Sequence, residues 1–240
     1  VTDTTIKITN GGKLIPIEKI FFEEKGDTID IREYREGDSE FTWLPAYIFG
    51  KLRSSSHYDD ENVIRTGAGR NGYGAKLTNI FSKLFTVIIE DPVSKTRFKC
   101  VWRDNMFKDS PSTKPEITVE KDENIKEGFL SIEWELDFER FKMKKYLIED
   151  KALFCKIAVD YSFACKIITT FNGVEMDYRD IYKYSALIFK PEEMQNTIVK
   201  FSWGENEMEK LSDNALLKKI IEAKKTEHIP ELEVLVLDTP

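Results

Sequence analysis

The sequence predicts an α+β fold, with a change of character after Asp177. Three observations lead to this prediction. Several segments alternate apolar and polar residues, which is the pattern of half-buried strands. Residues 75–85 carry apolar side chains at positions 77, 80, 81, 84 and 85, the spacing of a helix that packs on one face. Residues 178–240 then predict a charged helix at 213–225 and a last alternating strand at 231–238, so we expect a domain boundary near residue 177.

The N-terminal elements follow from local composition. The alternating strand 4–9 ends at Asn10-Gly11-Gly12, a sequence that favours a turn. The highly charged segment 23–42 contains two glycines and is interpreted as a surface excursion. Residues 43–52 predict a short apolar helix with a proline near its start. A polar loop, 54–66, leads into the glycine-rich stretch before helix 75–85.

The central segment reads mainly as strands. A buried strand at 86–91 should pair with an alternating strand at 96–106, because Asp-Pro-Val-Ser between them is typical of a turn. The remaining predicted elements are a polar loop at 107–128, a strand at 129–138, a helix at about 144–163 and a strand at 166–173.

Composition limits the possible classes of protein. With 240 residues, 41% of them hydrophobic, the chain can bury a core. A net charge of −7 argues against binding nucleic acid over the whole surface, although local basic patches remain open. No apolar run approaches the ~18 residues of a membrane helix. Three cysteines without a CxxC pair argue against disulfides and zinc, and indicate reduced, mostly buried thiols in an intracellular protein.

The glycine-rich stretch 65–76, RTGAGRNGYGAK, holds four of the twelve glycines and ends on Lys76. Gly67 to Gly72 spell GxGxxG, but the preceding SSSHYDDENVIRT cannot be the buried strand that a dinucleotide-binding fold requires. A P-loop requires GK[ST], whereas Leu77 follows Lys76. A flexible surface loop is the plainest interpretation. The fourth interpretation is a loop that ends at a helix N-terminus, where exposed amides, the helix dipole and Lys76 favour an anion.

The string SSSHYDD followed by TGAGRNGYGAKLTNIFSKLFTV resembles the ATP lid of type IIA DNA topoisomerases of the eukaryotic and viral kind, within the GHKL (Bergerat-fold) ATPase family. The GRNGYGAKLxNIFS part is long and specific. Further matches occur in the expected order: IKITNGGKLIPI, LPAYIFGKL, WRDNM, FERFKM, FNG and LEVLVLDTP. The resemblance implies that 1–177 is most of a GHKL ATPase subdomain, a mixed sheet with helices on one face. It also implies that 178–240 begins a ribosomal-S5-like transducer domain.

The same resemblance suggests nucleotide-binding residues. Asn10 would read the adenine amino group, with a turn asparagine as the alternative. Ser55 and Ser56 would contact ribose and phosphates, although His57 replaces the family's asparagine. The triphosphate would be wrapped by Gly69, Arg70, Asn71, Gly72, Tyr73, Gly74, Ala75 and Lys76. The alternative for Arg70 and Asn71 is that they are loop residues that face solvent. The acidic run 59–61 is interpreted as solvated charge.

The sequence departs from the family pattern in two places. Leu14 stands where the family has a glycine, and Leu130 stands where it has an adenine-contacting threonine. A shift of one residue would offer Ser131 instead. The family's catalytic glutamate and its Mg²⁺-binding asparagine would lie on a helix upstream of Val1, and its γ-phosphate lysine beyond Pro240. We therefore expect a truncated ATPase subdomain with no catalytic and no metal-binding residue of its own.

The function implied is the ATP-binding portion of an ATP-dependent type II DNA topoisomerase. In such an enzyme ATP, with Mg²⁺, drives lid closure and dimerisation, and one DNA duplex passes through another. The implied partners are duplex DNA and a second subunit, with no membrane, in the nucleus or in the cytoplasm of an infected cell. The alternative is a non-catalytic GHKL relic or a split-gene module that needs a partner chain. A MutL protein or a histidine kinase fits less well, because the GRNGYGAK string belongs to topoisomerases.

Overall fold

The computed structural model describes residues 1–25, 28–38, 41–51, 72–106, 114–195, 197–203 and 232–237. These residues fall into two compact units, one formed by the described residues up to Tyr146 and the other by those from Leu147 onward. The α+β class predicted from the sequence is confirmed.

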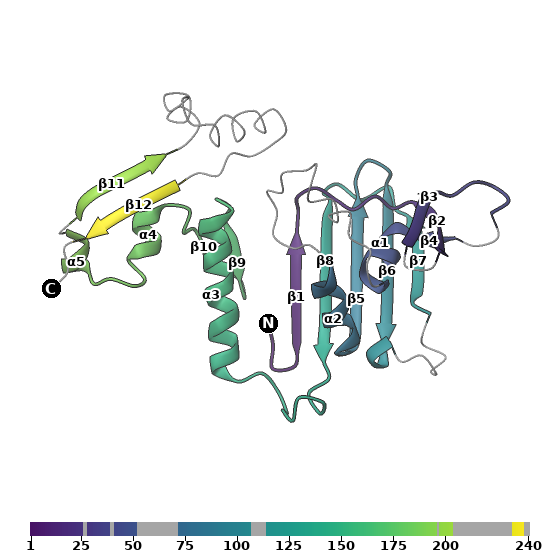
Figure 1. Cartoon of the computed structure of the whole chain (residues 1–240), viewed down its shortest axis with the longest axis horizontal. Coiled ribbons are helices and arrows are strands. Elements are labelled where there is room, and N and C mark those ends of the chain that lie inside the picture. Colours follow the sequence, from purple (N-terminus) through teal and green to yellow (C-terminus); the bar gives the residue numbers. More distant parts are fainter. Residues whose placement is uncertain are drawn as a thin grey trace. The chain divides into compact units, whose positions relative to one another are not determined.

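The first unit is built on a five-stranded sheet in the order β1-β8-β5-β6-β7 (Figure 1). All four strand pairings are antiparallel, so the described residues of this sheet contain no parallel pair. The strands are β1 (Thr5–Asn10), β5 (Ser82–Asp91), β6 (Thr96–Arg103), β7 (Glu116–Lys121) and β8 (Phe129–Leu136).

The hairpin between β5 and β6 forms as the sequence predicts. Asp91 accepts hydrogen bonds from the Val93 N–H at 2.9 Å and from the Ser94 hydroxyl at 2.6 Å. These bonds hold the turn, and Asp91 then pairs with Thr96 in the register of the two strands. The side-chain bonds also keep the pKa of Asp91 below its ordinary value, the Ser94 bond most of all.

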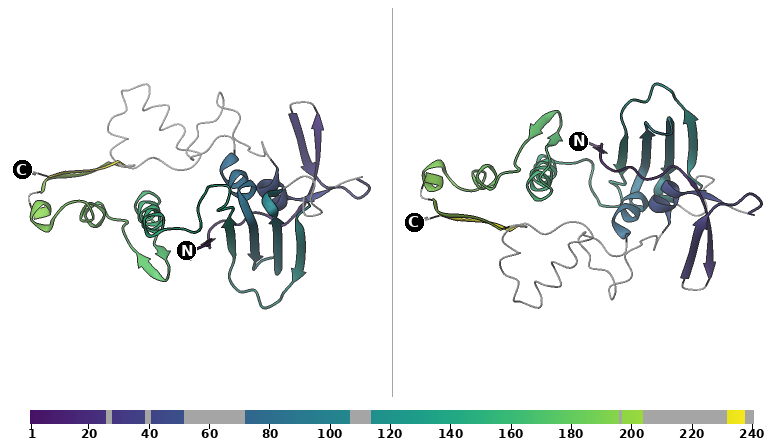
Figure 2. Two further views of the ribbon diagram at one scale, coloured as in Figure 1. Left: turned by 90° about the horizontal axis from the view of Figure 1, so that it is seen from below. Right: turned by 90° about the horizontal axis from the view of Figure 1, so that it is seen from above.

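One face of this sheet carries the core, and the helices α1 (Leu44–Gly50) and α2 (Tyr73–Ile80) lie on it (Figure 2). Ala46 and Phe49 of α1 pack against alternate residues of β5 and β6. Burial of each such large apolar side chain contributes ~1.5–3 kcal/mol. The buried strand residues are Phe85, Val87, Ile89, Phe98, Cys100 and Trp102. The opposite face is mixed, with apolar residues such as Ile88 and Val101 beside the ion pairs Glu90–Arg97 and Glu116–Arg103.

A smaller three-stranded sheet, in the order β3-β2-β4, occupies the segment interpreted as a surface excursion. Its strands are β2 (Lys19–Lys25), β3 (Thr28–Glu33) and β4 (Thr42–Trp43), and β4 continues directly into α1. The guanidinium of Arg32 in β3 donates two hydrogen bonds to the carboxylate of Asp38, which follows the strand, at 2.6 and 2.8 Å. The excursion therefore has regular secondary structure that its charge pattern concealed.

Several element boundaries differ from those predicted. The predicted helix 75–85 ends at Ile80, and Leu84 and Phe85 belong to β5. The predicted loop 107–128 contains β7, and the single strand predicted at 166–173 is a hairpin of β9 (Thr169–Phe171) and β10 (Val174–Met176). The predicted loop 54–66 and helix 213–225 lie outside the described residues.

The second unit begins with α3 (Ile148–Ala164), close to the predicted 144–163, and the β9–β10 hairpin packs on that helix. It continues with α4 (Ile181–Ser185), α5 (Pro191–Gln195), β11 (Thr197–Trp203) and β12 (Leu232–Leu237). β11 and β12 pair antiparallel, and β12 confirms the strand predicted at 231–238.

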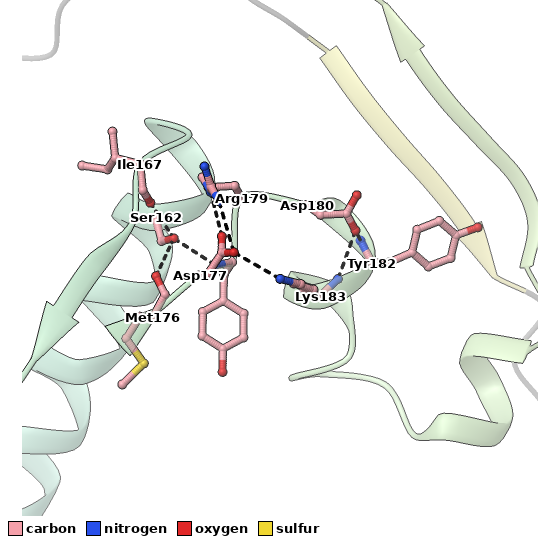
Figure 3. A network of polar contacts seen from close by, with 9 residues as sticks. Ser162, Ile167, Met176, Asp177, Arg179, Asp180, Tyr182 and Lys183 are labelled. Atoms are coloured by element: carbon pink, nitrogen blue, oxygen red, sulfur yellow. Dashed lines mark hydrogen bonds and ion pairs between the residues drawn. The ribbon is translucent and has the colours of Figure 1, made fainter. Parts of the chain in front are cut away.

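The helix α3 and its hairpin are joined through one buried hydroxyl, drawn in Figure 3. The Ser162 Oγ lies 2.7 Å from the Ile167 carbonyl and 2.9 Å from the Met176 carbonyl, and it accepts the Tyr178 N–H at 2.9 Å. Just beyond, Asp177 binds both Arg179 and Lys183. Residues on both sides of position 177 thus belong to one network, and the domain boundary predicted there stays a prediction.

Candidate functional site

The helix α2 starts from a glycine in a conformation that other residues rarely adopt. Gly72 caps the helix with φ 63° and ψ 26°, in the left-handed region. The first N–H groups of a helix have no partner within it, and no side-chain bond caps α2 among the described residues. With the positive end of the helix dipole, these amides form a site suited to an anion.

Lys76 lies in the first turn of α2 and is buried, with only 3% of its surface exposed. Within the described part of the chain its ammonium group has no hydrogen-bond or ion-pair partner. Burial alone lowers the pKa of Lys76 from its ordinary value. A buried positive charge without a counter-charge is unfavourable, and a bound anion would relieve it.

Asn79, which the sequence did not single out, is the second buried polar residue of α2. Its side-chain amide donates to the Phe49 carbonyl of α1 at 3.2 Å, and the residue is 1% exposed. Its Oδ1 is buried and meets no donor among the described residues. The Asn79 side chain therefore joins α2 to α1, and its Oδ1 can still accept a hydrogen bond.

The far end of α2 is held by the WRDNM segment. Asp104, Asn105 and Met106 have φ angles of 52°, 63° and 54°, three successive left-handed residues. The Asn105 side chain donates to the Ile80 carbonyl at 3.1 Å, which is one of the carbonyls left open at the end of a helix. This arrangement assigns Asn105 a structural role that the motif alone did not reveal.

Asn10 lies at the end of β1, on the helix-covered side of the sheet. It pairs in register with Leu130, which packs against the core. Its Oδ1 accepts the Gly12 N–H at 2.8 Å, the bond of a turn asparagine. The turn role is therefore present in the structure, and an adenine role for Asn10 stays a prediction.

The two departures from the family pattern are both part of the hydrophobic packing. Leu14 and Leu130 are half-buried against the core. Ser131 lies on the opposite face of β8, is 3% exposed and accepts a hydrogen bond from the Thr9 hydroxyl at 3.3 Å. A shift of one residue would therefore not bring Ser131 to the side of the sheet that carries α1 and α2.

The described residues bring Gly72, Tyr73, Gly74, Ala75 and Lys76 together at the start of α2, with Asn10 on the same side of the sheet. The predicted site residues Ser55, Ser56, Gly69, Arg70 and Asn71 lie outside the described residues, as do His57 and the acidic run 59–61. No group of three or more potential metal ligands occurs within the part of the chain that is described. None of the helices described is long and apolar enough to span a membrane.

An antiparallel sheet that carries two helices on one face, one of them starting after Gly72, is a fold that this chain shares with GHKL ATPase subdomains. The ATPase region of Saccharomyces cerevisiae topoisomerase II shares this fold with a TM-score of 0.62 and 27% identity, covering 83% of this chain and 46% of that one. The ATPase and transducer domains of Balamuthia mandrillaris DNA topoisomerase II match with a TM-score of 0.54 and 32% identity, over 72% and 39% of the two chains.

Comparison of sequences agrees with comparison of structures. DNA topoisomerase 2-beta of Mus musculus is 36% identical over 186 residues, and DNA topoisomerase 2 of Plasmodium falciparum is 33% identical over 190. These alignments cover 77% and 79% of this chain, but the chain spans only 10% and 12% of those relatives. No model of a protein family matches the sequence. The chain belongs to the type II DNA topoisomerases and corresponds to part of their ATPase region.

Proposed function

We propose that this chain is the nucleotide-binding portion of an ATP-dependent type II DNA topoisomerase. The observation that carries the proposal is Lys76, a buried lysine side chain whose ammonium has no described partner, in the first turn of a helix that starts after a glycine. A triphosphate at the start of α2 would meet the amides of Tyr73, Gly74 and Ala75 and the charge of Lys76 together. Each charge-assisted hydrogen bond of this kind contributes ~1.5–3 kcal/mol.

The residues fit a nucleotide better than they fit a metal ion. Asn10 keeps its side-chain N–H₂ group to contact a base, while Leu14 and Leu130 offer apolar surface beside it. The described residues provide no cluster of oxygen ligands for Mg²⁺. We propose that the ion enters with the phosphates, and that its protein ligands lie outside the described residues. When bound, Mg²⁺ would neutralise phosphate charge.

The β1 edge of the helix-covered face carries an exposed apolar side chain. Ile8 of β1 pairs in register with Ile132, on the side of the core, yet 55% of it is exposed. We propose that a helix upstream of β1, which the resemblance assigns to the family's glutamate base and Mg²⁺-binding asparagine, covers this edge. In the whole protein, nucleotide-driven lid closure and dimerisation of two subunits would then drive passage of one DNA duplex through another.

Calorimetric titration of the chain with ATP, ADP, adenosine and inorganic triphosphate tests nucleotide binding. If α2 and Lys76 hold phosphate, affinity should fall in the order ATP, ADP, adenosine, and triphosphate should compete with ATP. Adenosine binding as tightly as ATP would refute the phosphate site. Phosphate release tests catalysis separately. The 240-residue chain should show no turnover above background, and the same chain extended upstream should hydrolyse ATP. Equal rates in the two would show that the base lies within residues 1–240.

A further inference from the structure

A group of three aromatic rings surrounds a lysine ammonium at the base of the β3-β2-β4 sheet. The Lys19 Nζ lies 4.3 Å from the ring centre of Phe41 and 5.6 Å from the ring centres of both Tyr34 and Trp43. All three distances are within the ~6 Å range of cation–π attraction. We call Tyr34, Phe41 and Trp43 the aromatic cage.

Strand pairing explains why the three rings meet. Lys19 opens β2 and pairs with Trp43 of β4 on one side. On its other side the Tyr34 N–H donates to the Lys19 carbonyl at 3.3 Å, just after the last residue of β3. Phe41 contacts both of the other rings, edge to face, with centre distances of 5.3 Å to Tyr34 and 6.5 Å to Trp43. The backbone therefore places Tyr34 and Trp43 on either side of Lys19, and Phe41 completes the cage through its contacts with both rings.

The cage is anchored on one side and open on the other. Trp43 packs against Phe98 of the core at a ring-centre distance of 6.3 Å. Phe41 is 45% exposed and Lys19 is also exposed. The lysine reaches the rings through a flexible four-carbon stem, so it can leave the cage without unfolding the sheet.

We infer that the cage is a binding site for a methylated lysine side chain of a partner protein, with Lys19 as its resident competitor. Rings that enclose one ammonium group will enclose another. An unmodified ammonium is strongly hydrated, whereas methyl groups weaken that hydration and increase contact with the ring faces. Residues 18–43 contain nine acidic and four basic residues, a net charge of −5, which favours approach of a cationic segment.

The experiment titrates the 240-residue chain with a short peptide whose only charged group is one trimethyl-lysine. Binding is followed by the N-methyl proton signal in NMR. Replacing the competitor, Lys19→Ala, should tighten binding by about tenfold, which corresponds to about 1.4 kcal/mol. Lys13→Ala removes an exposed lysine outside the cage and should change nothing. In the Lys19→Ala background, Phe41→Leu should abolish binding. Phe21→Leu, which removes a ring that stacks instead on Arg32 at 4.3 Å, should not.

Matched probes identify the chemistry. The peptide with unmodified lysine should bind more weakly, and a neutral analogue with a tert-butyl group in place of trimethylammonium should not bind. Equal binding of the neutral analogue would overturn the inference, because the site would then be only apolar. Equal affinity for free choline would overturn the assignment to a lysine side chain. Absence of peptide binding to Lys19→Ala or Lys19→Met, with the circular dichroism of the wild type, would overturn the site itself.

Discussion

Replacing Lys76 with methionine should change the stability of the free chain and its affinity for ATP in opposite directions. Methionine has nearly the shape of the lysine stem but no charge. The Lys76 side chain is largely buried and its ammonium group has no described partner, and removing such a charge from water lowers the stability of the folded chain. Lys76→Met should therefore raise the free energy of unfolding at neutral pH, which denaturant titration measures.

The pH dependence of the free energy of unfolding tests the same effect of Lys76. The pKa of Lys76 in the folded chain lies below the ordinary 10.5, because burial disfavours the charged form. Between the lowered value and 10.5, the unfolded chain binds more protons than the folded chain. The stability of the wild type should therefore rise with pH through that window, and the gain from Lys76→Met should shrink.

Nucleotide binding should respond in the other direction. Loss of one charge-assisted contact of ~1.5–3 kcal/mol weakens ATP binding roughly ten- to a hundredfold. Binding of adenosine, which has no phosphate, should hardly change. Lys126→Met, at an exposed position between β7 and β8, is the matched control and should leave both quantities unchanged. If Lys76→Met destabilises the chain, or weakens ATP and adenosine equally, then Lys76 supports the fold and does not bind phosphate.

Three further predictions concern residues outside the candidate phosphate site. Because burial strongly raises the pKa of Cys100, iodoacetamide at pH 8 should label exposed Cys165 in the native chain and Cys100 only after unfolding, as mass spectrometry would show. Ser162→Ala should destabilise the second unit by ~1–3 kcal/mol and speed amide exchange in β9 and β10, whereas unchanged exchange would contradict its bridging role. The hydrogen bonds from Arg32 lower the pKa of Asp38 to about 2, so its stabilising effect should be present above its ordinary 3.8 and lost as pH falls towards 2. Carbon NMR should find that midpoint, and Arg32→Met should move it towards 3.8.

The sequence predicted the elements whose pattern had one physical explanation. The β5–β6 hairpin follows from a buried strand, an alternating strand and a proline turn between them, and helix 75–85 was correct up to Ile80. It was extended too far because Leu84 and Phe85 fit a helical spacing as well as the strand alternation that places Phe85 beside Val87 in the core. β7 was missed because it is an edge strand with mostly exposed, charged residues, and only Ile117 packs on the core.

The sequence motif predicted which residues form the candidate site, but it did not predict how deeply they are buried or what they contact. The glycines and Lys76 were identified from their order along the chain. That Lys76 is buried depends on how α2 packs against α1, which local sequence does not specify. Asn79 was missed for the same reason, since an asparagine in a helix is usually exposed, and only the structure shows its bond to Phe49.

A single residue, Phe81, separates α2 from β5, and this junction has no spare length. The Phe81 N–H donates to the Leu77 carbonyl, its own carbonyl accepts the Asp137 N–H, and the Ser82 hydroxyl donates to the Thr78 carbonyl. Inserting one residue here would turn the side chains of β5 to the other face of the sheet, moving Val87 out of the core and Glu90 towards it. Connections elsewhere in this unit can change length without altering a strand's register, but the register of β5 fixes the number of residues between α2 and the central strand.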